Sequence, residues 1–305
     1  MEKKTIIFVL GPTASGKSAV AAGLAEKLNG EVVSCDSMQV YKDMDVLTQH
    51  PAPDLIFKVP HHLVGIMPPE EEFNAAKYRE LAGIAVEQIF SRGKVPVFSG
   101  GTGLYVKAFL DGLFPAPGKD RVIRDSLEKQ ASEKGREYLH SRLKEIDPVS
   151  ASSIEPGDLR RIIRALEVYE LTGKTFSAHK AETKGITGEY VPRLFALKVS
   201  RERLVKRIEK RVDDMFSSGL VEEVSALSGR EISLTASKAL GLAEVTLLIS
   251  GESRLEEIKE QIKIKTRQYA KRQMTWLRGD DRVEWVDADR PIPEIVLEIV
   301  QKAGR

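Results

Sequence analysis

The stretch Gly11–Ser18, GPTASGKS, has the residue types and spacing of a loop that cradles phosphate groups. Its glycines let successive backbone N–H groups converge on an anion, Lys17 can neutralise phosphate oxygens, and the Ser18 hydroxyl can ligate Mg²⁺. The apolar run TIIFVL precedes the loop and a helical pattern follows it, as the motif requires. The alternative is a glycine turn that only joins a strand to a helix. We predict that the whole loop binds a phosphate-bearing ligand through Gly11, Pro12, Thr13, Ala14, Ser15, Gly16, Lys17 and Ser18.

Asp36 follows the apolar run EVVSC and is predicted to lie at the carboxyl end of a parallel strand, where ligands bind. A carboxylate at this position could act as a catalytic base. It could also cap a helix or turn in the segment DSMQVY, or hold Mg²⁺ through water. The residues alone leave these three roles open.

A third apolar run, VPVF, leads into Ser99–Tyr105, SGGTGLY, which brings the Thr102 hydroxyl to the same predicted sheet edge. Glycine turns often only relieve steric crowding, so the position of this turn is more informative than its composition. The adjacent His61 and His62 are expected to be ordinary loop residues, because neighbours on a strand would point to opposite faces.

Two regions with different sequence patterns must position these motifs. Short apolar runs alternate with helical patterns in the first third of the chain, which predicts a parallel sheet covered by helices. Charged helical patterns broken at EKG, DP and PGD then follow, before the strand RLFALKVS, a long helix pair, the edge strand VEWV and a terminal helix. We predict an α/β fold of the P-loop NTPase type. Its catalytic core would comprise residues 1–113 and 191–305, with an inserted all-helical domain at 114–190.

The formal net charge of this 305-residue chain is only +2, so local charge is more informative than bulk charge. Basic residues gather in RRIIRALEV, which starts at Arg160, and in Gln261–Arg278, which contains no acidic residue. The helix that carries the second segment is predicted to turn its basic residues outward and to bury one stripe. That stripe would comprise Leu255, Ile258, Ile262, Tyr269 and Trp276.

The single cysteine, Cys35, cannot form a disulfide within the chain and supplies no zinc-site spacing. The sequence has neither an apolar run of membrane-spanning length nor the order of regions found in a secretion signal. We therefore expect a cytoplasmic protein without redox chemistry or a structural metal.

Five segments, in chain order, resemble those of the tRNA dimethylallyltransferase family, also called tRNA isopentenyltransferases: GPTASGKS, SCDSMQVYKDMD, GGTGLY, DLRRIIRALEVYELTGK and RQYAKRQMTWLR. The resemblance spans nearly the whole chain. It implies transfer of a dimethylallyl group from dimethylallyl diphosphate to N6 of the adenosine 3′-adjacent to a tRNA anticodon, with Mg²⁺. The phosphate loop would hold the departing diphosphate and no phosphoryl group would move. Lys17 would stabilise its charge, Asp36 would be the base and Thr102 would orient the amine or a donor oxygen.

The same resemblance implies two partners, the tRNA anticodon stem-loop and dimethylallyl diphosphate, and a protein that is expected to act as a monomer away from membranes. Fourteen residues match tRNA-contacting positions of the family: Asp36, Ser37, Met38, Gln39, Thr102, Arg124, Arg160, Arg161, Ile162, Ile163, Arg164, Lys271, Arg272 and Gln273. Lys238 is assigned a diphosphate-binding role that other members give to arginine. The segments ALGLAEV and VLTQHP depart from the family pattern.

Three other functions fit parts of the sequence. An adenylate isopentenyltransferase would use similar loops on free AMP, although so small a substrate leaves the basic segments unexplained. A small-molecule or nucleotide kinase would hold ATP in the phosphate loop. An RNA-binding ATPase would use that loop as a switch and would leave the RNA chemically unchanged.

Overall fold

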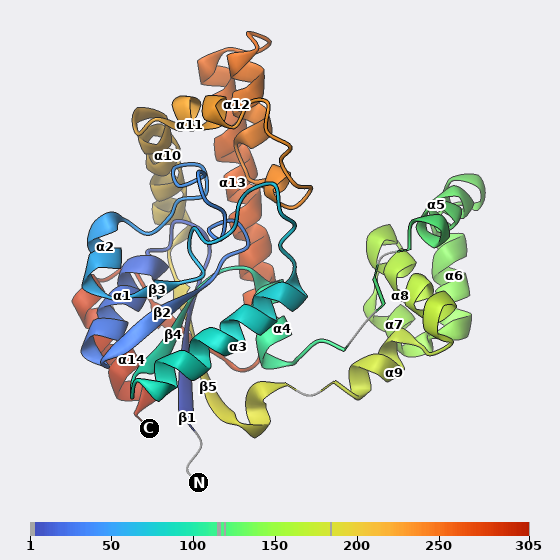
Figure 1. Cartoon of the computed structure of the whole chain (residues 1–305), viewed down its shortest axis with the longest axis horizontal. Coiled ribbons are helices and arrows are strands. Elements are labelled where there is room, and N and C mark those ends of the chain that lie inside the picture. The colour runs from blue at the N-terminus through green and yellow to red at the C-terminus, as the bar shows by residue number, and fades with distance from the viewer. Residues whose placement is uncertain (1–3, 115–116, 119, 184, 305) are drawn as a thin grey trace. The chain divides into compact units, whose positions relative to one another are not determined.

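The computed structural model describes residues 4–114, 117–118, 120–183 and 185–304. A parallel sheet with the strand order β3-β2-β4-β1-β5-β6 forms its centre (Figure 1). The strands are β1 (Lys4–Leu10), β2 (Gly30–Cys35), β3 (His61–His62), β4 (Val95–Gly100), β5 (Tyr190–Lys198) and β6 (Val283–Asp287). The predicted α/β fold with a parallel sheet is confirmed, and VEWV is an edge strand.

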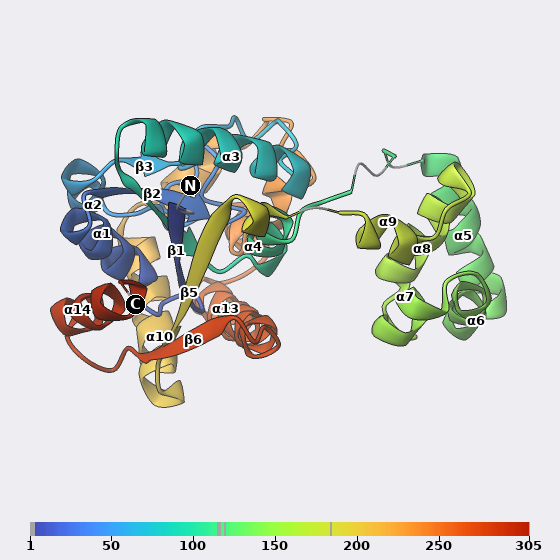
Figure 2. The same ribbon diagram turned by 90° about the horizontal axis from the view of Figure 1, so that it is seen from below.

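Both faces of the sheet are covered, so the central strand β1 is apolar on both sides. Ile7 and Val9 belong to the core beneath α1 (Lys17–Lys27) and α14 (Ile292–Ala303). Phe8 points to the other face and stacks on Phe98 with ring centroids 4.5 Å apart. On that face lie α3 (Ala75–Ser91) and α4 (Gly103–Leu110), as Figure 2 shows for α3. Continuous burial explains why the strands read as apolar runs rather than as alternating patterns.

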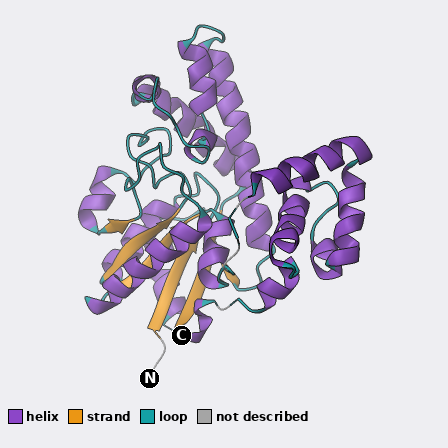
Figure 3. Ribbon diagram, turned by 45° about the vertical axis from the view of Figure 1, so that its right-hand side comes forward, coloured by secondary structure: helices purple, strands orange, loops and turns teal. Residues whose placement is uncertain are grey.

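A group of helices stands beyond the carboxyl ends of the strands (Figures 1 and 3). The longest members, α10 (Arg201–Ser217) and α13 (Leu255–Arg278), pack against each other. The shorter ones are α2 (Pro53–Lys58), α11 (Leu220–Ala226), the 3₁₀ turn η2 (Ala236–Lys238) and α12 (Leu242–Ile249). Of these elements, α2, α10, η2 and α13 contribute residues to the candidate site at the sheet edge.

The described chain divides into two compact units. One joins the chain up to Leu110 with the chain from Thr187 onward, and the other is Asp111–Ile186. The second unit is helical, with a core of its own. Its helices are α5 (Arg121–Lys134), α6 (Arg136–Ile146), α7 (Pro148–Ser153), α8 (Leu159–Thr172) and α9 (Phe176–Ala181), followed by the 3₁₀ turn η1 (Ile186–Gly188). The breaks predicted at EKG, DP and PGD fall between these helices.

Two local predictions were wrong. His61 and His62 form the short strand β3 rather than a loop, and His62 Nε2 lies 2.7 Å from Glu31 Oε2. The buried stripe of α13 was partly misassigned, because Leu255 is exposed. The side chains buried along α13 are Ile258, Ile262, Thr266, Ala270, Gln273 and Leu277. Within the described residues, no helix combines the length and the apolar character that crossing a bilayer requires.

Candidate active site

The phosphate loop connects β1 to α1 through two residues with left-handed backbone. Ala14 has φ of 63° and Gly16, which precedes α1, has φ of 91°. A side chain at Gly11 would place its Cβ 2.7 Å from Ser15 Oγ. The glycines therefore permit a tight turn that brings the amino end of α1, with its unpaired N–H groups, to the sheet edge.

Two helices distant in sequence hold this loop in place. Arg207 and Arg211 of α10 donate hydrogen bonds to Ser15 O at 3.2 Å and to Thr13 Oγ1 at 3.0 Å. The Thr13 N–H donates to Oε1 of Gln273, on α13, at 2.7 Å. The shape of the loop thus depends on side chains about two hundred residues away along the chain.

Lys17 and Arg211 bring two cations to the loop. Burial lowers the pKa of Lys17, whereas the carboxylate of Asp36 opposes that shift. The pKa of Arg211 is lowered by burial and raised by Asp36 in the same way. Because burial disfavours both charged forms, a bound anion would relieve this cost.

Asp36 lies directly after β2 and uses one carboxylate oxygen to shape the chain. Its Oδ1 accepts the N–H of Met38 at 2.9 Å, in the manner of an Asx turn. No donor within the described residues bonds the other oxygen, Oδ2. The turn role and the role of a base are therefore compatible, since each needs only one oxygen.

Thr102 is fixed against the Asp36 segment. Its Oγ1 accepts the N–H of Ser37 at 3.1 Å and its hydroxyl donates to Ser37 Oγ at 3.4 Å. The Thr102 N–H also donates to Cys35 O at 3.3 Å. The second and third predicted motifs thus meet at the sheet edge.

Two glycines of SGGTGLY, Gly101 and Gly103, are required by the approach of α13. A Cβ on Gly101 would lie 2.2 Å from Gln273 Nε2 and 2.9 Å from the Gly11 carbonyl oxygen, and one on Gly103 would lie 2.7 Å from the Trp276 ring. Trp276 Nε1 donates to the Gly101 carbonyl at 3.1 Å. The same helix therefore contacts both the phosphate loop and the Thr102 turn.

A cavity of about 570 Å³ opens beside these groups. Eleven of the predicted site residues line it: Thr13, Ala14, Gly16, Lys17, Ser18, Asp36, Ser37, Met38, Gln39, Lys238 and Arg272. Lys238 is exposed at this lining, whereas Gln273 is buried behind the phosphate loop. The Gln273 side chain therefore holds the phosphate loop, and its assignment as a tRNA contact stays a prediction.

The oxygen donors of the cavity could supply only part of the ligand set of Mg²⁺. The Ser18 hydroxyl and the Asp36 carboxylate both line the cavity and are the hard oxygen donors that Mg²⁺ prefers. Among the residues described, no group of three or more His, Cys, Asp and Glu side chains could hold a metal on its own. These residues therefore fit an ion that takes most of its ligands from water and a bound diphosphate.

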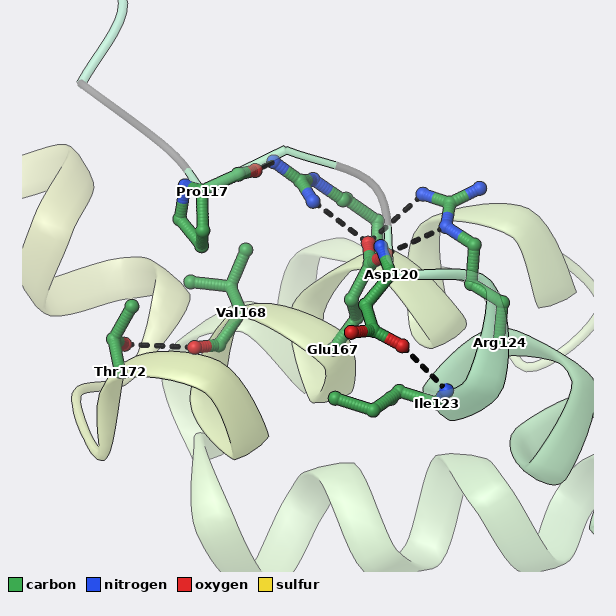
Figure 4. A network of polar contacts seen from close by, with 8 residues as sticks. Pro117, Asp120, Ile123, Arg124, Glu167, Val168 and Thr172 are labelled. Carbon is green, nitrogen blue, oxygen red and sulfur yellow. Dashed lines mark hydrogen bonds and ion pairs between the residues drawn. The ribbon is translucent and has the colours of Figure 1, made fainter.

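In the helical unit, the carboxylate of Glu167 is fully buried and accepts hydrogen bonds from two of the predicted tRNA-binding arginines (Figure 4). Arg124 donates to its two oxygens at 2.7 and 2.9 Å, and Arg164 donates at 2.7 Å. Burial alone would raise the pKa of Glu167, but these hydrogen bonds outweigh it and lower the pKa to about 2. Arg164 also donates to the Pro117 carbonyl at 3.0 Å. Both arginines therefore hold the helical unit together.

The rest of this predicted basic patch is divided between core and surface. Ile162 and Ile163 are 0% and 4% exposed, and their side chains belong to the core of the helical unit, so their match to tRNA-contacting positions stays a prediction. Arg160 and Arg161 are exposed, with Arg161 paired to Asp158 at 3.3 Å. The surface that RNA could reach on this helix is smaller than RRIIR suggested.

The basic segment of α13 is likewise partly neutralised. Lys263 pairs with Asp213 at 3.1 Å, Lys265 pairs with Glu244, and Arg267 pairs with Glu209 and Glu260. Within the described part of the chain, the exposed cations of this segment that make no ion pair are Lys271, Arg272 and Arg278. Available positive charge is thus concentrated near the end of the helix.

Arg211 and Tyr269 are among the cavity residues that the sequence did not single out for the site. Arg211 lines the cavity, and its spacing from Arg207 by one helical turn was the available signal. Tyr269 was expected in the core, yet it also lines the cavity. Burial raises its pKa, and the nearby Asp36 carboxylate adds to the shift, so its hydroxyl stays protonated.

A family model described as IPP transferase matches residues 39–280. A tRNA dimethylallyltransferase of Geobacter sulfurreducens is 45% identical across 93% of this chain and 92% of its own length. One of Carboxydothermus hydrogenoformans is 44% identical across 100% and 98%. The solved structure of the tRNA isopentenylpyrophosphate transferase of Bacillus halodurans is similar with a TM-score of 0.72 and 37% identity, covering 99% of this chain and 97% of that one. A eukaryotic dimethylallyltransferase acting on tRNA has a TM-score of 0.77 and 29% identity, covering 98% and 77%.

Proposed function

Because this chain belongs to the IPP transferase family, we propose that it transfers a dimethylallyl group from dimethylallyl diphosphate to N6 of the adenosine 3′-adjacent to a tRNA anticodon. The observation that carries this proposal is the meeting of three groups at one sheet edge. These are a cationic phosphate loop, a carboxylate with one free oxygen, and a hydroxyl fixed beside it.

The diphosphate would lie at the phosphate loop. Backbone N–H groups at the start of α1, together with Lys17 and Arg211, would stabilise the negative charge that grows as the allylic C–O bond breaks. The electron pair of that bond leaves with the diphosphate. Mg²⁺, held through Ser18 and the diphosphate, would add further charge neutralisation. No phosphoryl group is transferred and no ATP is consumed.

The acceptor amine would approach from the Asp36 side of the cavity. As N6 of adenine forms its bond to C1 of the donor, the nitrogen gains a fourth bond and a positive charge, so it must lose a proton. Asp36 Oδ2 would accept that proton while Oδ1 keeps its bond to the Met38 N–H. Thr102, fixed by Ser37, would orient the amine or a donor oxygen.

Each unit would contribute its own contacts to tRNA. Candidate phosphate contacts are the exposed Arg160 and Arg161 in the helical unit, and Lys271, Arg272 and Arg278 on α13. The target adenosine must leave its stack to reach a recessed carboxylate. We further propose that the protein acts as a monomer in the cytoplasm, where tRNA is found.

The test is to incubate the protein with dimethylallyl diphosphate, Mg²⁺ and unmodified tRNA, and then to digest the tRNA and weigh its nucleosides. We expect one adenosine to carry a dimethylallyl group in place of a hydrogen. Parallel reactions contain free AMP in place of tRNA, or ATP in place of the prenyl donor. Preferential prenylation of AMP would favour an adenylate enzyme. ATP-dependent phosphorylation, or RNA binding gated by ATP without modification, would overturn the proposal.

A further inference from the structure

The contact between α10 and α13 runs from the phosphate loop to an apolar end of the cavity. At the loop, Ile208 of α10 and Ala270 of α13 pack against Ala14. Farther along the two helices, Val212 and Met215 of α10 and Ile262 of α13 line the cavity. Beyond the loop, the side chains of this contact that face the cavity are therefore mainly apolar, with Thr266 as a polar neighbour between Ile262 and Ala270.

The distance between the two ends follows from helix geometry. With a rise of about 1.5 Å per residue, Met215 lies about 10 Å along α10 from Ile208, and Ile262 lies about 12 Å along α13 from Ala270. A diphosphate joined to a short branched hydrocarbon chain has a comparable length. A donor whose phosphates occupy the loop would therefore bring its hydrocarbon to these side chains.

The apolar end is closed by a fixed loop. Leu47 is 4% exposed and lines the cavity, and the N–H groups of Val46 and Leu47 both donate to Glu223 at 2.8 Å. A Cβ at Gly241 would lie 3.0 Å from Leu47 Cδ1 and 3.6 Å from Ile262 Cδ1. Leu47 and Ile262 therefore converge on the same place, which limits the space beyond them.

Burial at this end favours hydrocarbon. Val212, Met215 and Ile262 are 1%, 5% and 1% exposed. Lys238 lines the same cavity, but it is exposed, so its ammonium can remain in solvent. An apolar chain gains by leaving water here, whereas a polar substituent would lose its hydration.

We propose that Met215 and Ile262 determine the chain length of the prenyl donor by closing the apolar end of the cavity behind a five-carbon group. This inference rests on the proposed function and deepens it, because it assigns the discrimination among allylic diphosphates to two side chains. A longer donor is excluded because its additional carbons would collide with these residues.

The experiment compares dimethylallyl diphosphate with an allylic diphosphate that carries two more carbons at its branched end. Met215→Ala and Ile262→Ala each remove three heavy atoms, which is enough space for the longer chain. We expect the ratio of kcat/KM for the longer donor to that for the five-carbon donor to rise about tenfold or more, since a single methylene can change this ratio by that amount.

Ile258→Ala is the matched control. Ile258 is fully buried one turn before Ile262 on the same helix, and it is not among the described residues that line the cavity. Its loss should weaken folding without changing the donor ratio, and melting curves identify any variant that fails to fold. If wild-type protein uses the five-carbon donor but Met215→Ala and Ile262→Ala change the ratio no more than Ile258→Ala does, the inference is wrong. If wild-type protein transfers neither group, the proposed function itself fails.

Discussion

The two carboxylate oxygens of Asp36 have different roles, because only Oδ1 accepts the Met38 N–H. A substitution can therefore test the proposed base separately from the turn. An asparagine at this position keeps an oxygen that can accept the Met38 N–H, so the local turn can survive. What the amide cannot do is take up a proton as the carboxylate does. The substitution therefore removes the proposed base without removing its structural role.

We predict that Asp36→Asn lowers the single-turnover rate of prenyl transfer by about 10²–10⁴, the usual contribution of a general base. Affinity for tRNA should change little. Rapid-quench kinetics at saturating tRNA and donor measure the chemical step, and filter binding measures affinity. A variant with a normal rate and weakened tRNA binding would make Asp36 a recognition residue.

At the scale of elements, α13 unites the site, because Gln273 and Trp276 fix two loops that follow different strands. The other strands and the three edge motifs could be predicted, because each motif directly follows its own apolar run, whereas the short strand β3 could not, since His61 and His62 form no apolar run. The contacts of α13 could not, since they join residues 260 and 175 positions apart, and no local pattern encodes such pairs. Tyr269 was misassigned for the same reason, because helical spacing does not reveal a cavity.

We predict that Gly101→Ala abolishes most activity, with a loss of at least about 100-fold, because a displacement of about 1 Å can cost this much. The added Cβ would collide with Gln273 and with the Gly11 backbone, and so would disturb both loops at once. Steady-state prenyl transfer measures the loss.

Gly83→Ala is the control for the chemical change itself. Gly83 lies within α3, and a Cβ there meets no atom within 4 Å. This substitution should leave activity intact and raise stability by up to about 1 kcal/mol, as alanine does in a helix. Equal activity of the two variants would show that the close approach at Gly101 has no importance for the site.

The buried Glu167 predicts acid sensitivity of the helical unit. Its pKa falls from the ordinary value of 4.5 to about 2 in the folded protein. A lowered folded-state pKa contributes stability above the unfolded-state pKa, and this contribution is lost as the pH falls through the folded-state pKa. Wild-type protein should therefore lose more stability than Glu167→Gln between pH of about 4.5 and about 2.

Urea melts of both proteins at a series of pH values measure the free energy of unfolding. Subtracting one pH profile from the other cancels the titration of the carboxylates that the two proteins share. Glu167→Gln should also be less stable at neutral pH, because it leaves Arg124 and Arg164 without a buried anion. Parallel pH profiles for the two proteins would contradict the assignment of the low pKa to Glu167. The pair Arg164–Glu167 could have been predicted, since its members are three residues apart on one helix, whereas Arg124 could not.

For the whole molecule, binding to a polyanion depends on cations that are exposed and are not held by a buried anion. In the helical unit this reasoning favours Arg160 and Arg161 over Arg124 and Arg164. We predict that replacing Arg160 and Arg161 by alanine flattens the log–log dependence of tRNA affinity on salt by up to about 1.4, at about 0.7 for each lost phosphate contact in single-stranded RNA.

Affinities measured from low to high salt test this expectation. Arg164→Ala is the contrasting change, because it removes a partner of buried Glu167 and should lower the melting temperature more than it alters the salt slope. A salt slope that stays the same in the double variant would show that these exposed arginines do not contact the RNA backbone.

The close fit of α13 over Gly101 and Gly103 also restricts how this sequence can diverge. A larger residue at Gly103 is tolerable only if the ring of Trp276 gives way, and one at Gly101 only if Gln273 is altered and the Gly11 backbone also shifts. A single substitution cannot achieve either change without a defect. A larger residue at the glycine alone creates a steric overlap, and a smaller side chain on α13 alone leaves an empty space. Two segments some 175 positions apart should therefore be inherited as a matched pair, and recombination between divergent copies should fail wherever it separates them.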